Sequence, residues 1–226
     1  MAITVVQTQS ISNSFSGDFS SNVTAGNTVF LVVFSYAAAD VTISSSSPQV
    51  NGNPVTGATE LITVQAPFSG GGTVYAAIWM LPDVTGGATG VSVTVTNGSL
   101  STSVGVVAYE VSGLGTTPSL DQSSTGSGTT GSVTSGSSGN TASSPELIIG
   151  AAATYGGSPS GPDGYANTTM GLGFVYAGEQ VAATSGNSYS YATGSGTATW
   201  CAGVVTVESS AATPSGITYQ MRRIGR

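Results

Sequence analysis

The sequence contains no lysine and no histidine, and its only cations are Arg222, Arg223 and Arg226 at its end. Charged residues make up 6% of the 226 positions, against roughly a quarter in an ordinary soluble domain. The ten carboxylates precede the arginines, and the net charge is −7. Because a nucleic-acid-binding surface needs several cations to displace counterions, this composition argues against direct binding of DNA or RNA.

The missing histidine and lysine also remove most catalytic and metal-binding chemistry. A Ser-His or Cys-His nucleophile and a lysine Schiff base cannot form, and zinc and iron lose their usual ligands. A carboxylate pair of the glycosidase kind remains. Its candidates are Glu60, Glu110, Asp121, Glu146, Glu179 and Glu208. Glutamates at strand ends are usually solvated caps, and nothing else supports catalysis, so we expect a non-enzymatic protein.

Two further patterns fail on their context. The segment at 126–131, "GSGTTG", matches a dinucleotide-binding spacing, but it has neither an apolar strand before it nor a helix after it. The carboxylates are scattered, and no calcium-loop spacing occurs among them. We therefore expect no cofactor and no dedicated metal site.

Cysteine and long apolar runs are scarce as well. Cys201 is the only cysteine, so no internal disulfide can form, and its setting in "TATWCAGVVTV" predicts a small buried side chain. The opening "MAITVVQTQS" has no cationic region followed by an apolar run, and no stretch reaches membrane-spanning length. We expect a soluble protein that does not use the usual export route.

What the chain does contain is a series of β-branched and aromatic runs separated by Gly, Pro, Asn and Asp, which is typical of a sandwich or barrel. Strands are predicted at 3–9, 27–36, 59–65, 73–81, 90–97, 103–111, 145–154, 172–181, 187–193 and 198–208. The runs "VFLVVF" and "VYAAIWML" are apolar at every position, so they predict central strands covered on both faces. "VSVTVT" alternates and predicts a half-exposed strand. Asn51-Gly52 and Asp163-Gly164 predict turns.

A weak internal repeat joins the two halves. "GVVAYEVS" at 105–112 matches "GVVTVESS" at 203–210, "LVV" at Leu31 resembles "LII" at Leu147, and "VYA" occurs at Val74 and Val175. The matches are short, so duplication and chance both remain open. The predicted fold is an all-β single sandwich over 1–226, jelly-roll-like with two Greek-key halves.

Three segments of this domain have distinct predicted roles. Residues 1–25 form an N-terminal strand or arm. Residues 122–144, rich in Ser, Thr and Gly, are either a flexible linker or an ordered crossover with one or two exposed edge strands, and we favour the crossover. Residues 215–226 form a C-terminal docking tail.

The tail is predicted to bind a partner because the chain has no lysine with which to blunt its sheet edges. Its cations suit forked hydrogen bonds to an acidic partner. The residues expected at this interface are Ile217, Tyr219, Met221, Arg222, Arg223, Ile224 and Arg226. A frayed, solvated tail is the alternative.

Tyrosines gather in the second half of the chain. Those beside Gly, Ser or Asn could stack on sugars or anchor an interface, or simply occupy half-buried strand positions. The candidates for glycan or interface contact are Tyr155, Tyr165, Tyr189 and Tyr191.

Five motifs follow one another along the chain: "VYAAIWMLPDVTGGATGVSVTVT", "VVAYEVSGL", "LDQSSTGSG", "PELIIGAAATY" and "GEQVAATSGNSYSYATGSGTATWCAGVV". In this order they resemble a Gly/Thr-rich β-sandwich of tailed-phage virion proteins and of bacterial surface proteins. The resemblance covers about residues 26–208 and consists of structural punctuation, with no catalytic residues to carry over. It implies a jelly-roll-like sandwich with a structural or adhesive role.

These observations predict a non-enzymatic virion protein, first of all a capsid decoration or cement protein that binds a major capsid or other virion protein through its terminal segments. We expect a homo-oligomer assembled in the host cytoplasm, with no nucleic-acid or membrane partner. Repeated weak contacts on a symmetric shell would add avidity. A tail or fibre component is the near variant, and a carbohydrate-binding or adhesive module is the alternative.

Overall fold

The computed structural model describes residues 2–37, 42–43, 48–69, 71–92, 95–96, 100–156, 160–170, 175–196 and 199–210. These residues form strands and loops without a helix, and accordingly no helix in the described ranges could cross a membrane. The strands of the first half are β1 (Thr4–Ser12), β2 (Ser16–Asp18), β3 (Thr28–Ala37), β4 (Thr42–Ile43), β5 (Gln49–Val50), β6 (Asn53–Pro54), β7 (Thr59–Phe68), β8 (Gly72–Leu81), β9 (Gly90–Ser92), β10 (Val95–Thr96) and β11 (Leu100–Ser112). Those of the second half are β12 (Ser119–Gly128), β13 (Gly131–Thr134), β14 (Glu146–Tyr155), β15 (Ala166–Thr169), β16 (Val175–Ala182), β17 (Ala192–Gly196) and β18 (Thr199–Glu208).

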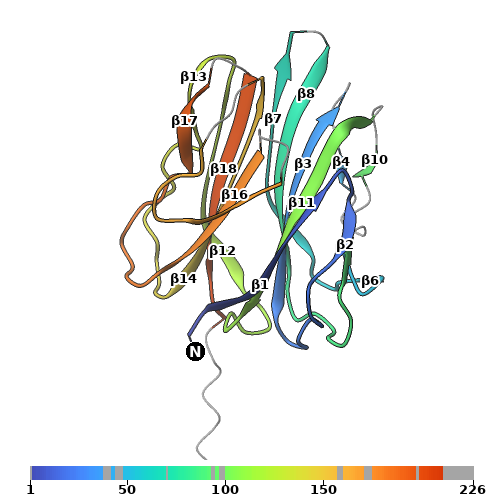
Figure 1. The fold of residues 1–226 in the computed structure, drawn as a ribbon. Coiled ribbons are helices and arrows are strands. Elements are labelled where there is room, and N and C mark those ends of the chain that lie inside the picture. Colours follow the sequence, from blue (N-terminus) through green and yellow to red (C-terminus); the bar gives the residue numbers. More distant parts are fainter. Residues whose placement is uncertain are drawn as a thin grey trace, which may run out of the picture.

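Two five-stranded antiparallel sheets pack face to face (Figure 1). The first has the order β1-β11-β3-β8-β7, and the second has the order β12-β18-β14-β16-β15. The predicted all-β sandwich is confirmed. Each half of the chain forms one complete sheet, so the halves do not share sheets.

The two sheets have the same topology. If the five strands of each large sheet are numbered in chain order, both sheets read 1-5-2-4-3. Three sequence matches fall on equivalent strands, namely β11 with β18, β3 with β14 and β8 with β16. The shared order therefore supports duplication over chance. It differs from a Greek key, in which three hairpin-connected strands lie in sequence, because each large sheet has only one pair of neighbours that are consecutive among its strands, β7 with β8 and β15 with β16.

The ladders also fix the register of the repeat. Val107 pairs with Val32, which pairs with Ile78, and the equivalent ladder runs through Val205, Ile149 and Glu179. Val107 and Val205 are 98 residues apart, as are the first residues of the matching segments at 105 and 203. Ile78 and Glu179 are 101 residues apart, as are Val74 and Val175. The same pairing aligns Leu31 with Ile148 rather than with Leu147. The sequence match of Leu31 with Leu147 is thus one residue out of register. A pairing shifted by one residue would place every side chain of the strand on the opposite face of the sheet.

Small sheets cover the outer faces and give the molecule four layers with three cores. The central core lies between the large sheets. A second core lies under the sheet β2-β9-β5-β6, and a third lies under the pair β13-β17 (Figure 1). β2 and β9 follow the first and fourth long strands of their half, as β13 and β17 do in theirs. The duplication therefore extends to the outer layers.

The central strands are buried on both faces, as their sequences predict. In β3, Phe30 and Val32 face the central core, while Leu31 and Val33 face the second core. Every residue of β8 is buried. A strand with core on both sides cannot alternate in polarity, which explains why these two runs are apolar throughout.

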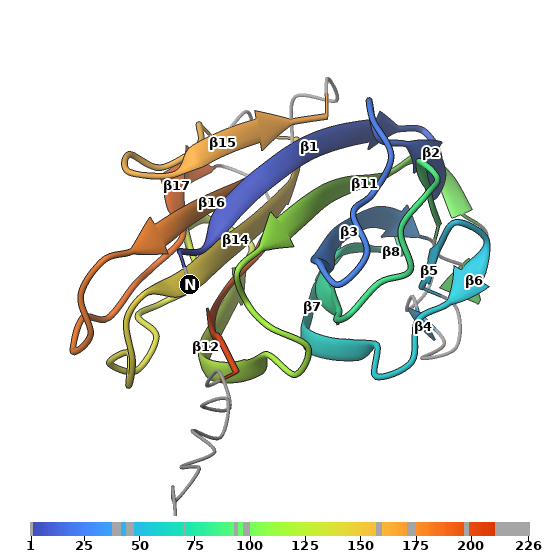
Figure 2. The same cartoon turned by 90° about the horizontal axis from the view of Figure 1, so that it is seen from below.

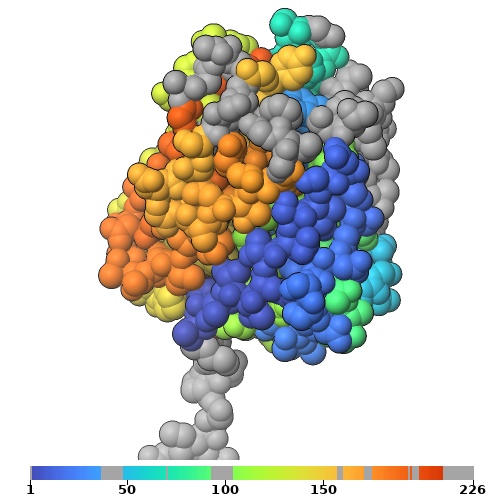
Figure 3. All heavy atoms as spheres, in the orientation of Figure 1, coloured from blue at the N-terminus to red at the C-terminus, as the bar shows by residue number. Residues whose placement is uncertain are grey.

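On one side of the sandwich, the edge strands β1 and β15 meet. The Ser10 hydroxyl donates to the carbonyl of Thr169 over 3.1 Å, and the Ser12 hydroxyl donates to the carbonyl of Met170. Figures 2 and 3 show the blue N-terminal strand lying along the orange second-half segment. Part of the predicted N-terminal arm is therefore the edge strand of the first sheet.

The polar crossover forms strands where the sequence left two interpretations open. β12 is the edge of the second sheet, and β13 pairs with β17. Between β13 and β14 the chain continues without a strand. The predicted strand at 187–193 begins only at Ala192, because the Ser135 and Ser138 hydroxyls accept from the backbone of Tyr191 and Tyr189 in place of a longer ladder.

Candidate functional site

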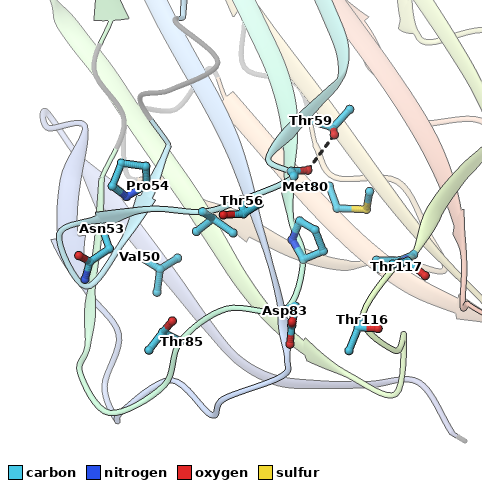
Figure 4. Close-up of a pocket in the computed structure, with 14 residues that line it drawn as sticks. Val50, Asn53, Pro54, Thr56, Thr59, Met80, Asp83, Thr85, Thr116 and Thr117 are labelled. Atoms are coloured by element: carbon cyan, nitrogen blue, oxygen red, sulfur yellow. Dashed lines mark hydrogen bonds between the residues drawn. The ribbon is translucent and has the colours of Figure 1, made fainter.

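A cup of about 560 Å³ opens at the end of the sandwich where β7 begins and β8 ends (Figure 4). We call it the threonine cup. It is lined by Val50, Asn53, Pro54, Val55, Thr56, Gly57, Thr59, Met80, Pro82, Asp83, Thr85, Thr116, Thr117 and Pro118. This volume is in the range of small-molecule sites, about 300–1,000 Å³.

Three loops with defined turn chemistry build the cup. Asn51 and Gly52 both have positive φ, at 57° and 74°, which is the type I′ hairpin predicted by the Asn-Gly pair. This hairpin joins β5 to β6 and forms one wall. The loop after β8 supplies Asp83, and the linker between the two large sheets supplies residues 116–118.

The floor and the rim of the cup differ in polarity. Val50, Met80, Pro82 and Pro118 are buried and form an apolar floor. The rim is exposed and carries hydroxyls, one amide and one carboxylate: Thr56, Thr59, Thr85, Thr116, Thr117, Asn53 and Asp83. The sequence pattern "LPDVTGG" predicts only a loop here, and the approach of 116–118 depends on how the two sheets stack, so the cup is not visible in the sequence.

Among the predicted carboxylates, Glu110 is fully buried. It accepts hydrogen bonds from Gln7 Nε2 at 2.5 Å, from the Thr24 backbone N–H at 2.8 Å and from Asn27 Nδ2 at 2.6 Å. The expectation of a solvated strand cap is wrong for this residue, because the 20–27 segment folds over the strand end. Its position among fixed donors makes it a structural anchor.

Glu146 and Glu208 are cross-strand neighbours in the second sheet. Glu146 is fully buried; its Oε1 accepts from the backbone N–H and hydroxyl of Ser143, while its Oε2 has no partner among the residues that the structure describes. Glu208 accepts from the Ser119 hydroxyl at 3.0 Å. Asp121 accepts from the backbone N–H of Ala142 at 2.8 Å.

The other two candidates lie apart from this group. Glu60 lies on β7 and Glu179 on β16, and partial burial raises the pKa of each carboxyl above its ordinary value of 4.5. Within the described ranges, no three acidic or cysteine side chains converge on a metal position.

The four candidate tyrosines separate into buried and exposed positions. Tyr191 is fully buried in the third core, donates to Asn167 Oδ1 at 2.9 Å and contacts Tyr165 edge-on at 5.0 Å. Tyr165 and Tyr189 pack against the same core and are half-buried. Tyr155 remains 48% exposed, so it is the most exposed of the four.

Tyr155 belongs to an aromatic cluster at the far end of β7 from the cup. Its ring stacks on Phe68 with centroids 4.1 Å apart and planes at 9°, and Tyr36 meets it edge-on at 5.7 Å. Such stacked and T-shaped pairs add roughly 0.5–1.5 kcal/mol each beyond burial. The cluster therefore holds the Tyr155 ring against Phe68 and Tyr36 at the surface.

Two further predictions from the sequence concern Cys201 and the C-terminal tail. Cys201 is buried in the central core, as its setting predicts, and burial raises the pKa of its thiol to about 12. The predicted docking tail at 215–226 lies outside the described residues. The same is true of its expected interface residues Ile217, Tyr219, Met221, Arg222, Arg223, Ile224 and Arg226.

Comparison of the chain with protein-family models, with curated proteins and with solved structures finds no match.

Proposed function

We propose that this chain is a non-enzymatic structural protein of a tailed-phage particle, and that it decorates the capsid by binding neighbouring subunits through its terminal segments. A tail or fibre component is the near variant of the same proposal. The assignment to a phage particle rests on the sequence resemblance to β-sandwiches of virion proteins. The physical argument for binding to neighbouring subunits comes from the edge strands of the fold.

Three of the four edge strands are nine or ten residues long, and all four are almost uncharged. β1, β7, β12 and β15 are the outermost strands of the large sheets, and together they carry Glu60 and Asp121 and no cation. Val6 on β1 and Leu120 on β12 are 48% and 38% exposed. Soluble sandwiches normally blunt such edges with lysine, so edges of this kind are suited to cover by a neighbouring subunit.

Light scattering of the purified chain at two salt concentrations tests this proposal. We expect a closed oligomer or a salt-sensitive association, because contacts of the three arginines with acidic surfaces are screened by salt. A chain truncated after Ser215 should lose the association. Replacing Arg222, Arg223 and Arg226 by Gln should also abolish the association. Because this variant keeps the full length of the tail, it tests the role of the positive charge alone. A monomer under every condition would contradict self-assembly.

A carbohydrate-binding or adhesive role is the second candidate, and the exposed ring of Tyr155 favours it. Aromatic faces stack on the C–H faces of sugars. Tyr155→Ala should then elute earlier than the parent chain from a polysaccharide column, whereas Tyr155→Phe keeps the ring and should not. Equal elution of all three proteins would remove this role for Tyr155.

A further inference from the structure

The wall of the threonine cup is an addition that the repeated core does not need. In the first half, 21 residues connect β3 to β7, and they include β5 and β6. The equivalent connection from β14 to β15 has 10 residues. The second sheet forms its core without this extension, so the extension is specific to the first half, where it adds Val50 to the second core and builds the wall of the cup.

The rim of the cup presents hydrogen-bonding groups that the other described residues leave free. The Thr59 hydroxyl donates to the Gly57 carbonyl at 2.9 Å, and the Asn53 amide donates to the Asn51 carbonyl at 3.1 Å. The remaining groups have no partner in the described part of the chain: the hydroxyls of Thr56, Thr85, Thr116 and Thr117 and the carboxylate of Asp83. Groups of this kind are available to a ligand that replaces water.

The backbone fixes the position of Asp83 at the rim. Asp83 has a φ of 48°, a left-handed conformation that costs free energy for most residues but is accessible to Asp and Asn. Val84 holds it there, since its N–H donates to the Asn27 carbonyl at 2.9 Å and its carbonyl accepts from Gly26 at 3.0 Å. Backbone strain of this kind is concentrated at binding and switch sites.

The charge of the cup restricts its ligand. Asp83 is the only charged residue of the lining, and the chain has no cation before Arg222, so an anion would meet an uncompensated carboxylate. A single carboxylate is too few for a calcium site. The apolar floor adds surface that an ion or a small amine would not use.

We propose that the threonine cup binds a neutral saccharide of one or two rings. The sugar's C–H face would lie on Met80, Pro82 and Pro118, two neighbouring hydroxyls would donate to the Asp83 carboxylate, and the threonine hydroxyls would donate and accept around the rim. Charge-assisted hydrogen bonds to a carboxylate are about twice as strong as neutral ones, so Asp83 carries most of the specificity. This inference is independent of docking on a particle.

Backbone amide NMR of the full chain tests the proposal with the methyl glycosides of glucose, galactose, mannose and N-acetylglucosamine, each at about 20 mM, a concentration that nearly saturates a site with a Kd of about 1 mM. We expect at least one glycoside to shift the amides of the cup, such as those of Thr56, Asp83 and Thr117. Asp83→Asn should weaken binding at least tenfold. Asparagine also adopts the left-handed conformation, so the variant should keep its fold. Asp163→Asn, an exposed aspartate in the other half, should bind like the parent.

Three results would overturn the inference. One is the absence of shifts with all four glycosides. Another is a set of shifts located at the aromatic cluster around Tyr155 instead of the cup, and the third is equal binding by Asp83→Asn and the parent chain. A synthetic peptide of residues 211–226 tests the alternative that the cup binds a cationic peptide, because it carries all three arginines. If the peptide shifts the cup amides and no glycoside does, the cup is a peptide site and the saccharide proposal is wrong.

Discussion

Met170 lies directly over Gly105, where a β-carbon would come within 2.5 Å of the Met170 sulfur. Ile62 lies over Gly203 in the same way, so that a β-carbon on Gly203 would overlap its Cδ1. Gly105 and Gly203 are equivalent residues of the two halves, and Ile62 lies on β7 while Met170 directly follows β15, the equivalent strand. The two sheets therefore interlock reciprocally, each filling a glycine notch in the other.

This interlock predicts that Gly203→Ala destabilises the fold by roughly 1–3 kcal/mol, the usual cost of overpacking. Ile62→Val removes the overlapping methyl group and should cost about 0.5–1.5 kcal/mol alone. In the double variant, the valine makes room for the new methyl group, so the combined loss should be smaller than the sum. Urea unfolding of the four proteins measures this coupling. Strictly additive losses would show that Ile62 and Gly203 do not interlock.

The buried anchor Glu110 gives the second prediction. Glu110→Gln should lower the free energy of unfolding by about 3 kcal/mol, because it removes a carboxylate that satisfies three donors in a buried site. Glu208 occupies the equivalent position, and its hydrogen bond within the described ranges comes from Ser119 at the surface. Glu208→Gln should therefore cost less than about 1 kcal/mol. Equal losses in the two variants, measured by urea unfolding, would contradict the distinction.

Much of the fold could be predicted from the sequence because strand periodicity and turn chemistry are local. The apolar runs of β3 and β8 predicted central strands, and Asn51-Gly52 predicted its hairpin. The register of the repeat is wrong at one sequence match, because "LVV" at 31–33 resembles "LII" at 147–149 better than "IIG" at 148–150, the residues with which the strand pairing aligns it. Glu110 was misjudged because the segment that covers it is some 85 residues away in the chain. The cup depends on the stacking of two sheets, which no local pattern encodes.

The tyrosines give a third prediction. Tyr191→Ala should destabilise the fold by roughly 3–5 kcal/mol, as expected for a large side chain removed from a core, and it also removes the bond to Asn167. Tyr155→Ala loses one exposed ring and its stack on Phe68, so we expect about 1 kcal/mol. Thermal and urea unfolding of both variants separates the structural tyrosine from the surface one. A large loss for Tyr155→Ala would mean that the aromatic cluster supports the fold.

Alkaline pH should unfold the protein, since burial raises the pKa of several weak acids. The pKa values of Tyr75 and Tyr165 rise from 10 to about 12, and that of Cys201 rises from 9 to about 12. Burial also raises the pKa values of Tyr36 and Tyr191.

Above pH 9 the unfolded chain loses protons that the folded chain keeps. Stability is therefore fully present below pH 9 and falls as the pH rises toward 12, by up to roughly 1.4 kcal/mol per pH unit for each such group. The urea midpoint should drop between about pH 8 and about pH 11. Tyr75→Phe has one titrating group fewer, so its midpoint should fall less steeply over the same interval. A midpoint that stays constant across this range would show that these side chains reach solvent in the folded protein.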